Sequence, residues 1–509
     1  MIKAKLCLPR LTSSVFLSIC SVLLLCLLLL TSCGKPLAIE VPAAQEEKNA
    51  LHQLQGEIAA VLGDPLLASS NVDIKVASVT TGEVLYESDA DKLYHPASTM
   101  KLLTSATALE KLSPNYRFHT TLYTEGIEGA RVRGNLYLKG RGDPLLVVED
   151  LVEMVETLFH SGVNRVEGDI VVDDTYFDDV PKGKGWMWDD GPIGGYYSHQ
   201  SALTVNHNGV KVTVSPGAEI GDPVRLRLDP PTEYLEVLND AVTVGASESG
   251  TLRVERQTNP VPANVLTISG FMPANQDAMR RHVDIVNPAL FCGTLFKESL
   301  ARNGILVQGV VRQGVVPDGV SEIAVHTSLP LSLVARKMNK RSDNLIAELL
   351  LKTLGAEVIG TPGTSQKGLR VINEFMSETG IAATQSTLAD GSGVSRYNLL
   401  SAAMLTDLLV RMFQDFSVMP EYVMSLPIAG VDGTLSWRMR DSGAEGVLRA
   451  KTGTMRGVTT LAGYAMTVDG EILAFAMLMS HYVGSPNPRR ALQDRIGNIL
   501  TRFSRMRGG

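Results

Sequence analysis

Three short motifs carry side chains that could perform nucleophilic catalysis. They are Ser98-Thr99-Met100-Lys101, Ser342-Asp343-Asn344 and Lys451-Thr452-Gly453. A serine hydroxyl is a poor nucleophile until a base removes its proton, and a lysine three residues further along a helix lies on the same face. Lys101 could be that base if burial and a second cation, such as Lys451, lower its pKa. These residue types indicate acyl transfer by a lysine-assisted serine, which needs neither histidine nor metal.

Each motif alone is a weak signal. The S-x-x-K pattern also occurs at Ser32 and S-x-N occurs four times, whereas K-T-G occurs once. Taken singly, Ser98 and Ser342 could be ordinary helix caps, and Lys451 could be an exposed strand end. The order of the three motifs, their wide spacing and their positions beside predicted helices and a strand make the combination specific.

Hydrophobic spacing predicts the elements that must position these motifs. Apolar residues recur at helical spacing from Ser98 to Leu112, so Ser98 is expected in the first turn of a helix. Further helices are expected at 331–341, 344–354 and 489–503. Strands are expected at 73–78, 83–88, 447–451, 459–468 and 471–480, with K-T-G at the end of the third. We therefore expect an α/β (α+β) fold with one five-stranded antiparallel sheet covered by helices.

The middle of the chain has a different texture. A chain of 509 residues is long enough for two or three domains. Residues 116–320 are rich in Gly and Pro, with short β-like runs such as 136–139, 210–214 and 224–228 and a helical stretch at 151–159. We expect a mostly β insert of one or two subdomains, with the catalytic domain made of 51–115 and 321–509.

The N-terminal 32 residues are predicted to be a lipoprotein signal peptide. A basic start precedes an apolar run from Val15 to Leu30, and the sequence Leu30-Thr31-Ser32-Cys33-Gly34 resembles a site of lipid attachment to Cys33. The run is shorter than the roughly 20 residues that a membrane-spanning helix needs, although an uncleaved anchor or ordinary cleavage are alternatives. Residues 33–50 are predicted to be a polar tether.

Charge and cysteine content exclude several classes of function. Without residues 1–32 the net charge falls from −7 to about −10, which argues against nucleic acid as a partner. Beyond Cys33 the sequence contains one cysteine, Cys292, which is expected to be a buried apolar residue. No ligand spacing typical of zinc or iron–sulfur sites appears, so we expect no metal and no cofactor.

The chain resembles the DacB-type, class C penicillin-binding proteins, which are D-alanyl-D-alanine carboxypeptidases and endopeptidases. The resemblance covers nearly all of residues 51–509. Besides the three motifs, it rests on the long insertion, on Gly140-Arg141-Gly142-Asp143-Pro144 and on Ala389-Asp390-Gly391-Ser392-Gly393-Val394-Ser395-Arg396. Class A β-lactamases share the three motifs but have no room for the insertion, so they fit poorly.

The resemblance implies roles for the residues of the first two motifs. Ser98 would be the nucleophile that forms the acyl-enzyme, and Lys101 its base. Ser342 and Asn344 would relay a proton and contact the substrate amide. The substrates implied are the stem peptides of peptidoglycan, and β-lactams would be covalent inhibitors of the same serine.

The third motif and the residues that follow it would bind the substrate. Lys451 and Thr452 would hold its terminal carboxylate, with Gly453 between that threonine and Thr454. The backbone N–H groups of Ser98 and Thr454 would form the oxyanion hole.

Two further residues, Arg396 and Met455, resemble family residues that face the diamino-acid branch of the stem peptide. A solvated arginine and a core methionine are the alternatives. The enzyme is expected on the periplasmic side of the cell envelope, attached to a membrane through lipid on Cys33. Two other functions stay open, namely a silent peptidoglycan-binding lipoprotein and a β-lactam hydrolase or esterase on the same fold. The sequence does not indicate the oligomeric state.

Overall fold

A computed structural model describes residues 40–186, 196–257, 264–381 and 385–505. The chain divides into two compact units, residues 1–52 with 505–509 and residues 53–504. The predicted signal peptide and Cys33 lie outside the described residues. Within the first unit, Arg505 forms an ion pair of 2.6 Å with Glu47. In the described part of the chain, no helix is both long and apolar enough to cross a membrane.

The tether expected at 33–50 is a helix over much of its length. Helix α2 runs from Glu40 to Leu62, so the part of the predicted tether from Glu40 onward is helical. The reason is composition, because Ala, Glu, Gln and Leu predominate here and all four are strong helix formers.

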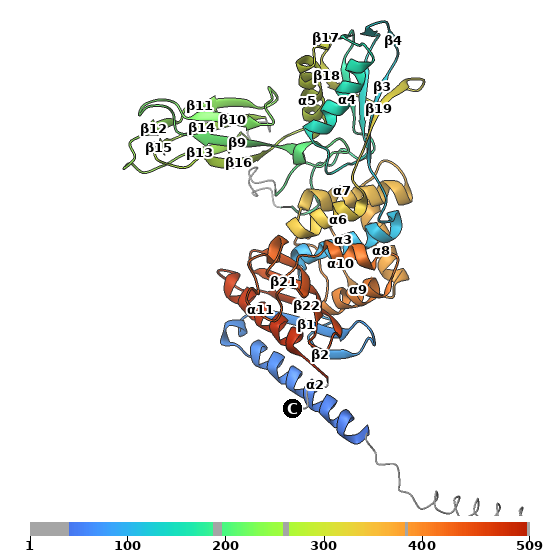
Figure 1. Cartoon of the computed structure of the whole chain (residues 1–509), viewed down its shortest axis with the longest axis vertical. Helices are drawn as coiled ribbons and strands as arrows, with labels where there is room; N and C mark the ends of the chain where they lie inside the picture. Colours follow the sequence, from blue (N-terminus) through green and yellow to red (C-terminus); the bar gives the residue numbers. More distant parts are fainter. Residues whose placement is uncertain (1–39, 187–195, 258–263, 382–384, 506–509) are drawn as a thin grey trace, which may run out of the picture. The chain divides into compact units, whose positions relative to one another are not determined.

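The predicted five-stranded antiparallel sheet is confirmed. Its order is β2-β1-β22-β21-β20, and every neighbouring pair is antiparallel. The strands are β1 (Asn71–Ser78), β2 (Val84–Ser88), β20 (Leu448–Met455), β21 (Val458–Met466) and β22 (Ile472–Ser480). Because β1 pairs with β22, two segments from opposite ends of the sequence share one sheet (Figure 1).

The strand that carries K-T-G is longer than expected. The sequence predicted its end at Lys451, but β20 continues to Met455, so the motif lies inside the strand. Residues 452–455 pair with 458–461 of β21, and these backbone hydrogen bonds extend the strand. The edge of β20 opposite β21 is partly covered near its start, where Ile428 bridges to Arg449.

Helices surround a core shared with the central strands β21 and β22. They are α3 (Met100–Leu112), α6 (Leu331–Arg341), α7 (Asn344–Leu354), α8 (Ser365–Glu378), α9 (Ala402–Gln414) and α10 (Met419–Ser425). The short 3-10 turn η2 (Ala97–Thr99) leads directly into α3. Helix α11 (Asn487–Arg502) packs against β21. The predicted helices at 331–341 and 344–354 agree with α6 and α7.

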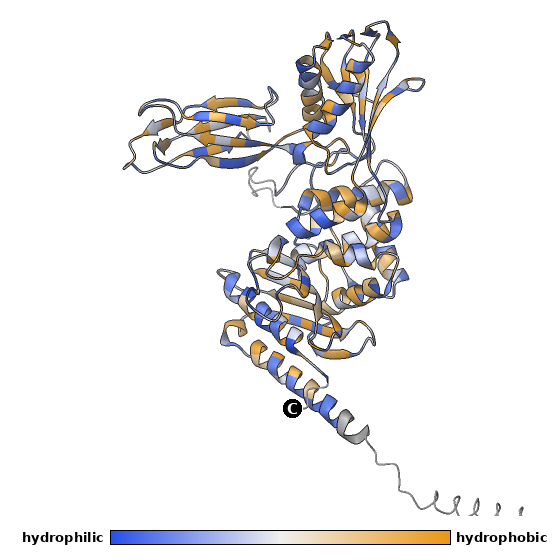
Figure 2. Cartoon of the chain, in the orientation of Figure 1, coloured by the Kyte–Doolittle hydropathy of each residue, from blue (hydrophilic) through white to orange (hydrophobic). Residues whose placement is uncertain are grey.

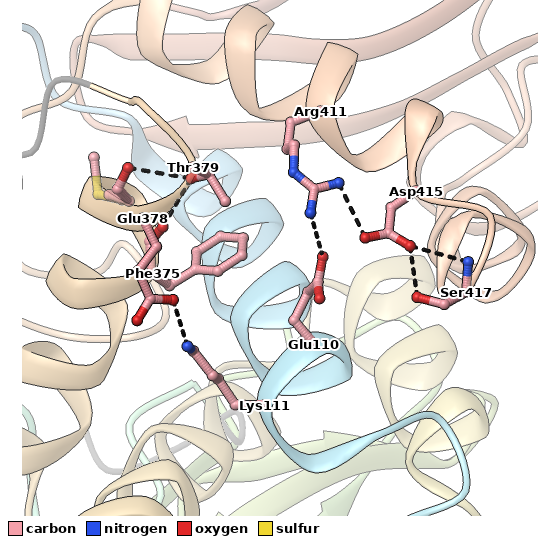
Figure 3. Close-up of polar contacts among 9 residues, drawn as sticks. Glu110, Lys111, Phe375, Glu378, Thr379, Arg411, Asp415 and Ser417 are labelled. Carbon is pink, nitrogen blue, oxygen red and sulfur yellow. Dashed lines mark hydrogen bonds and ion pairs between the residues drawn. The ribbon is translucent and has the colours of Figure 1, made fainter.

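Ion pairs hold the C-terminal end of α3 against two other helices. Lys111 pairs with Glu378 of α8 at 2.5 Å. Glu110 lies 3.5 Å from Arg411 of α9, and Arg411 in turn pairs with Asp415 at 3.0 Å (Figure 3). These partly exposed pairs contribute little each, but they connect α3 to both neighbours at the end opposite Ser98.

In its described residues, the segment between α3 and α6 forms several further sheets and the two helices α4 and α5. One sheet has the order β18-β8-β6-β3-β19, another β17-β7-β5-β4, and the rest are β10-β9-β16, β11-β14-β13 and β12-β15. The strands of the first two sheets are β3 (His119–Thr124), β4 (Ile127–Glu128), β5 (Arg131–Val132), β6 (Leu136–Gly140), β7 (Arg165–Val166), β8 (Ile170–Asp173), β17 (Leu306–Val307), β18 (Val311–Gln313) and β19 (Ser321–Thr327). The remaining strands are β9 (Gly209–Ser215), β10 (Arg225–Asp229), β11 (Glu236–Asn239), β12 (Val242–Val244), β13 (Arg253–Arg256), β14 (Val265–Ser269), β15 (Phe271–Pro273) and β16 (Met279–Asp284).

A second hydrophobic core belongs to this segment. Helices α4 (Val148–His160) and α5 (Pro288–Arg302) contribute to it, and Cys292 is buried there as the sequence predicted. Hydrophobic and hydrophilic residues alternate along strands such as β10, whose two faces therefore differ in exposure (Figure 2). Strand β19 pairs with β3, so this sheet includes residues 321–327, which the sequence analysis grouped with the catalytic domain.

Candidate active site

Ser98 lies in the 3-10 turn that precedes α3. Ala97 before it has a positive φ of 46°, and the hydroxyl that closes this turn belongs to Thr99, whose Oγ1 donates to the carbonyl of Pro96 at 2.6 Å. The Ser98 hydroxyl instead lies 3.1 Å from Nζ of Lys101. Ser98 is therefore not a simple helix cap, and its side chain is free to face a substrate.

Lys101 lies one helical turn after Ser98, at the start of α3, and its side chain is fully buried. Its Nζ lies 2.8 Å from Oδ1 of Asn344 and donates to the carbonyl of Ser392 at 2.6 Å, in addition to its contact with Ser98. Burial lowers the pKa of Lys101 to about 8, although neighbouring carboxylates partly oppose this effect. A substantial neutral fraction near neutral pH is what a general base requires.

The second motif joins two helices. Ser342 ends α6 with a left-handed backbone of φ 57°. The side chain of Asp343 caps α7 by accepting from the backbone N–H of Ile346 at 3.0 Å. Asp343 is therefore the N-cap of α7, the role that the alternative interpretation assigned to Ser342. Asn344 begins α7, and its amide nitrogen donates to the carbonyl of Tyr196 at 3.1 Å.

Lys451 connects the third motif to the second. It is fully buried, so the alternative of an exposed strand end is wrong. Its Nζ donates to Oγ of Ser342 at 2.8 Å and to the carbonyl of Thr452 at 2.7 Å. Burial, together with the charge of Lys101, holds the pKa of Lys451 well below its usual value. The three motifs therefore meet in one hydrogen-bonded cluster.

Gly453 allows β20 to lie against the turn that holds Ser98. A Cβ at this position would be 2.1 Å from Oγ1 of Thr460 and 2.9 Å from both the Pro96 carbonyl oxygen and the Ser98 nitrogen. Any side chain would therefore separate the strand from the serine. The φ of Gly453 is not in the left-handed region, so backbone conformation does not require glycine here. The close approach of the two backbones does.

A cavity of about 930 Å³ opens beside this cluster. It is lined by Ser98, Tyr196, His207, His282, Arg341, Ser342, Asp343, Asn344, Thr434, Trp437, Arg438, Thr452, Thr454, Asn487, Arg490, Ala491 and Asp494. The hydroxyl of Thr452 donates to Thr434 at 2.7 Å. Among the predicted substrate-binding residues, Thr452 and Thr454 face this cavity.

Arg396 and Met455 are not brought into the cavity wall. Arg396 is exposed and donates to the carbonyl of Arg456 at 3.0 Å, next to Met455 at the end of β20. Met455 is half-buried. The two predicted pocket residues therefore lie near one another, outside the residues that line the cavity.

No pattern in the sequence points to His207, which reaches the site from the middle segment. It lies in a tight turn, Asn206–Asn208, whose three residues all have positive φ. Its Nε2 lies 2.7 Å from Oδ2 of Asp343. Burial by itself would lower the pKa of His207, but the hydrogen bond and charge of Asp343 outweigh burial and raise it. A histidine in a polar loop has no pattern that would reveal this contact.

Glu348 is a second residue that sequence reasoning missed. It is fully buried on α7, and one carboxylate oxygen accepts from the backbone N–H groups of Gly391 at 3.0 Å and Ser392 at 2.8 Å. Burial raises the pKa of Glu348 to about 8. Its place four residues after Asn344, inside the apolar run from Leu345 to Leu351, is a signal that could have identified it.

The described ranges contain no preformed metal site. There, no group of three or more His, Cys, Asp or Glu side chains is arranged to hold a metal ion.

Comparisons with known proteins agree on one family. The model of the D-Ala-D-Ala carboxypeptidase 3 (S13) family matches residues 54–502. The chain is 39% identical over 479 residues to a D-alanyl-D-alanine carboxypeptidase of Actinomadura sp., covering 91% of this chain and 87% of that protein. It is 26% identical over 426 residues to the D-alanyl-D-alanine carboxypeptidase DacB of Haemophilus influenzae, covering 83% of this chain and 88% of that one.

Solved structures show the same fold. The crystal structure of penicillin binding protein 4 (dacB) from Haemophilus influenzae matches with a TM-score of 0.76 and 25% identity, covering 87% of this chain and 98% of that chain. A structure of the same protein complexed with a β-lactam matches with a TM-score of 0.71 and 23% identity, covering 88% of this chain and 100% of that chain.

Proposed function

Because the chain belongs to the D-Ala-D-Ala carboxypeptidase 3 (S13) family, we propose that it is a serine D-Ala-D-Ala carboxypeptidase and endopeptidase that acts on peptidoglycan stem peptides. The family and the relative that is 39% identical establish the peptidase class. One observation carries the assignment of the reacting groups. The buried Nζ of Lys101 lies 3.1 Å from the hydroxyl of Ser98, in the wall of the cavity.

In the proposed acylation step, neutral Lys101 accepts the proton of the Ser98 hydroxyl. The Oγ then forms a bond with the carbonyl carbon of the penultimate D-Ala. The negative charge that develops on the carbonyl oxygen is stabilised by the backbone N–H groups of Ser98 and Thr454, a type of donor whose loss typically costs about 3 to 4 kcal/mol.

The leaving amine needs a proton when its C–N bond breaks. Ser342 lies 2.8 Å from Nζ of Lys451 and lines the cavity, which supports a relay from Lys451 through Ser342 to the departing nitrogen. D-Ala, or the amine of a cross-link, leaves. Water then attacks the ester on Ser98, and the released peptide carries a new carboxylate.

The edge of β20 supports the proposed substrate contacts. Beyond Arg449 the strand faces the cavity with Thr452 and Thr454, and an extended peptide could add to such an edge by main-chain hydrogen bonds. Thr452 and Lys451 would hold the terminal carboxylate, and Asn344 would contact the substrate amide. Gly453 permits the close approach that this arrangement needs.

Arg396 and Met455 are proposed to contact the diamino-acid branch of the stem peptide. Their mutual proximity at the end of β20 supports a shared role, although they lie outside the cavity that contains Ser98.

β-Lactams are proposed to acylate Ser98. The Haemophilus influenzae penicillin binding protein 4, which has the same fold, is known in complex with a β-lactam. Because the substrate is cell-wall peptide, the enzyme is proposed to act in the cell envelope, held at a membrane through lipid on Cys33.

The test combines labelled penicillin with a muramyl pentapeptide. Wild-type protein should take up one label and release D-Ala. The Ser98→Ala variant should take up none and lose at least about 10³-fold in D-Ala release. Label on Ser98→Ala would refute the assignment. Binding of the pentapeptide without release would favour a silent binding protein, and rapid loss of label from intact protein would favour a β-lactam hydrolase.

A further inference from the structure

The catalytic cavity continues past Thr454, and the proposed function, in which Thr452 and Lys451 hold the terminal carboxylate, places the leaving part of the substrate there. Its far wall is built by the start of α11, with Arg490 and Asp494, and by the turn before β20, with Trp437 and Arg438. The total volume of about 930 Å³ is in the range that holds a drug-sized ligand. This volume must hold the acyl part of the substrate beside Ser98, so the wall beyond Thr454 is the part available to the leaving group.

Arg490 provides a cation at the inner end of this wall. Its Nη2 donates to Oγ1 of Thr454 at 2.9 Å, and its Nη1 donates to Oδ1 of Asn487 at 3.1 Å. Within the described residues no carboxylate lies within 4 Å of its guanidinium. Arg438 differs, because Asp494 neutralises it at 2.7 Å. Arg490 is therefore placed to bind an anionic group that also contacts Thr454.

Trp437 provides a hydrophobic surface at the outer end. Its side chain is 80% exposed, and the guanidinium carbon of Arg440 lies 3.7 Å from the centre of its ring. Stacking of Arg440 on the ring limits the orientation of the indole. The turn that carries Trp437 is joined to the K-T-G strand through the hydrogen bond between Thr434 and Thr452.

We propose that Arg490 and Trp437 form a binding subsite for the leaving group of a cross-linked substrate. Arg490 joins Thr452 and Lys451 in binding the free carboxylate on the carbon that bears the departing amine, and Trp437 contacts the rest of the leaving residue. D-Ala satisfies the first contact alone. A diaminodicarboxylic acid residue of a second stem peptide satisfies both, because its amine and carboxylate share one carbon and its chain continues outward.

This subsite rests on the proposed function, and it assigns a structural basis for cleaving cross-links as well as terminal D-Ala. The subsite also predicts that some kinds of cross-link are cleaved better than others. A link through a side-chain amine that has no carboxylate on the same carbon forfeits the contact with Arg490, and so should be a poorer substrate.

The test measures kcat/KM on three substrates: a pentapeptide, its C-terminal amide, and a peptide dimer cross-linked through a diaminodicarboxylic acid. Trp437→Ala should lower the ratio of dimer to pentapeptide cleavage about fivefold or more. Arg490→Gln should lower cleavage of the pentapeptide and the dimer at least about tenfold but cleavage of the amide much less. Two matched controls should leave all three rates unchanged. Phe416→Ala removes another highly exposed aromatic side chain, and Arg495→Gln changes an arginine on α11, the helix that carries Arg490.

Several results would overturn the subsite. They are an unchanged dimer-to-pentapeptide ratio in Trp437→Ala, an unchanged preference for acid over amide in Arg490→Gln, and cleavage of the pentapeptide but not the dimer by wild-type protein. If wild-type protein cleaved none of the substrates and took up no penicillin label, the proposed function itself would fail, and the subsite with it.

Discussion

At the scale of single residues, two buried ionisable side chains, Lys101 and Glu348, shape the surroundings of Ser98, one by direct contact and one through the backbone. Lys101 contacts Ser98, Asn344 and Ser392 through its amine. Glu348 fixes the backbone on which one of those contacts depends, since it accepts from the N–H of Ser392. The lowered pKa of Lys101 and the raised pKa of Glu348 share a cause, because burial disfavours the charged form of each.

The pKa of Lys101 predicts how acylation depends on pH. A general base works only when deprotonated, and burial lowers this pKa to about 8. The second-order rate of acylation by labelled penicillin should therefore rise about tenfold per pH unit below pH 7 and level off above about pH 8. Lys101→Arg should lose at least about 10³-fold and show no such rise, because arginine stays protonated. A rate already constant between pH 5.5 and 7 would contradict this role.

Removal of the Glu348 carboxyl should destabilise the site. Glu348→Ala would leave two buried backbone N–H groups without an acceptor, at a cost of about 2 to 4 kcal/mol in the free energy of unfolding. Glu348→Gln keeps an acceptor oxygen and should cost less than about half as much. Denaturant unfolding of both variants measures the difference, and equal losses would show that the hydrogen bonds are not the cause.

At the scale of elements, the edge strand β20 and the turn η2 form one unit. The strand provides Lys451 and the threonines, the turn provides Ser98, and Gly453 lets the two backbones touch. Helix α3 then extends from the turn and is held at its far end by the ion pairs of Glu110 and Lys111 (Figure 3). The distance between Ser98 and the backbone of β20, which we propose as nucleophile and oxyanion donor, therefore depends on contacts between elements.

Gly453→Ala should separate the strand from the serine. Its Cβ would overlap Oγ1 of Thr460 and press on the backbone of Ser98, so we expect acylation to fall at least about 100-fold and unfolding free energy to fall by about 1 to 3 kcal/mol. Gly56→Ala is the control, since nothing lies within 4 Å of the added carbon in α2, and it should be neutral or stabilising. Normal acylation by Gly453→Ala would show that the close approach is dispensable.

At the scale of the whole molecule, the middle segment contributes directly to the site. His207 projects from a turn just before β9 and binds Asp343, which caps the helix that begins with Asn344. The insertion therefore supplies part of the cavity wall as well as its own core. Its folding and the geometry of the second motif should be coupled through this contact and through the hydrogen bond from Asn344 to the carbonyl of Tyr196.

A double-mutant cycle measures that coupling. His207→Ala and Asp343→Asn should each slow acylation about tenfold, and the double variant should lose less than the sum, with a coupling free energy of about 1 to 3 kcal/mol in unfolding. His160→Ala, at an exposed histidine of the same segment, is the control and should change neither quantity. Additive losses would mean that the two side chains act independently.

Local pattern in the sequence was sufficient for most of the elements. Helical spacing predicted α6 and α7, alternation and turn residues predicted the five strands of the main sheet, and the three motifs predicted which segments meet. Such features depend on neighbours within a few residues, so they are legible without a structure. The family resemblance supplied the expected roles of those motif residues.

Long-range contacts decided the rest. Whether Lys451 is buried, how far β20 extends, and whether Arg396 reaches the cavity all depend on groups far away in the sequence. His207 and Arg490 became part of the site only because folding places them beside Asp343 and Thr454. The sequence by itself determined which residues are proposed as the reacting groups, and their order along the chain. The tertiary structure decided their burial, hence their pKa values, and the shape of the cavity around them, because both depend on packing across the whole fold.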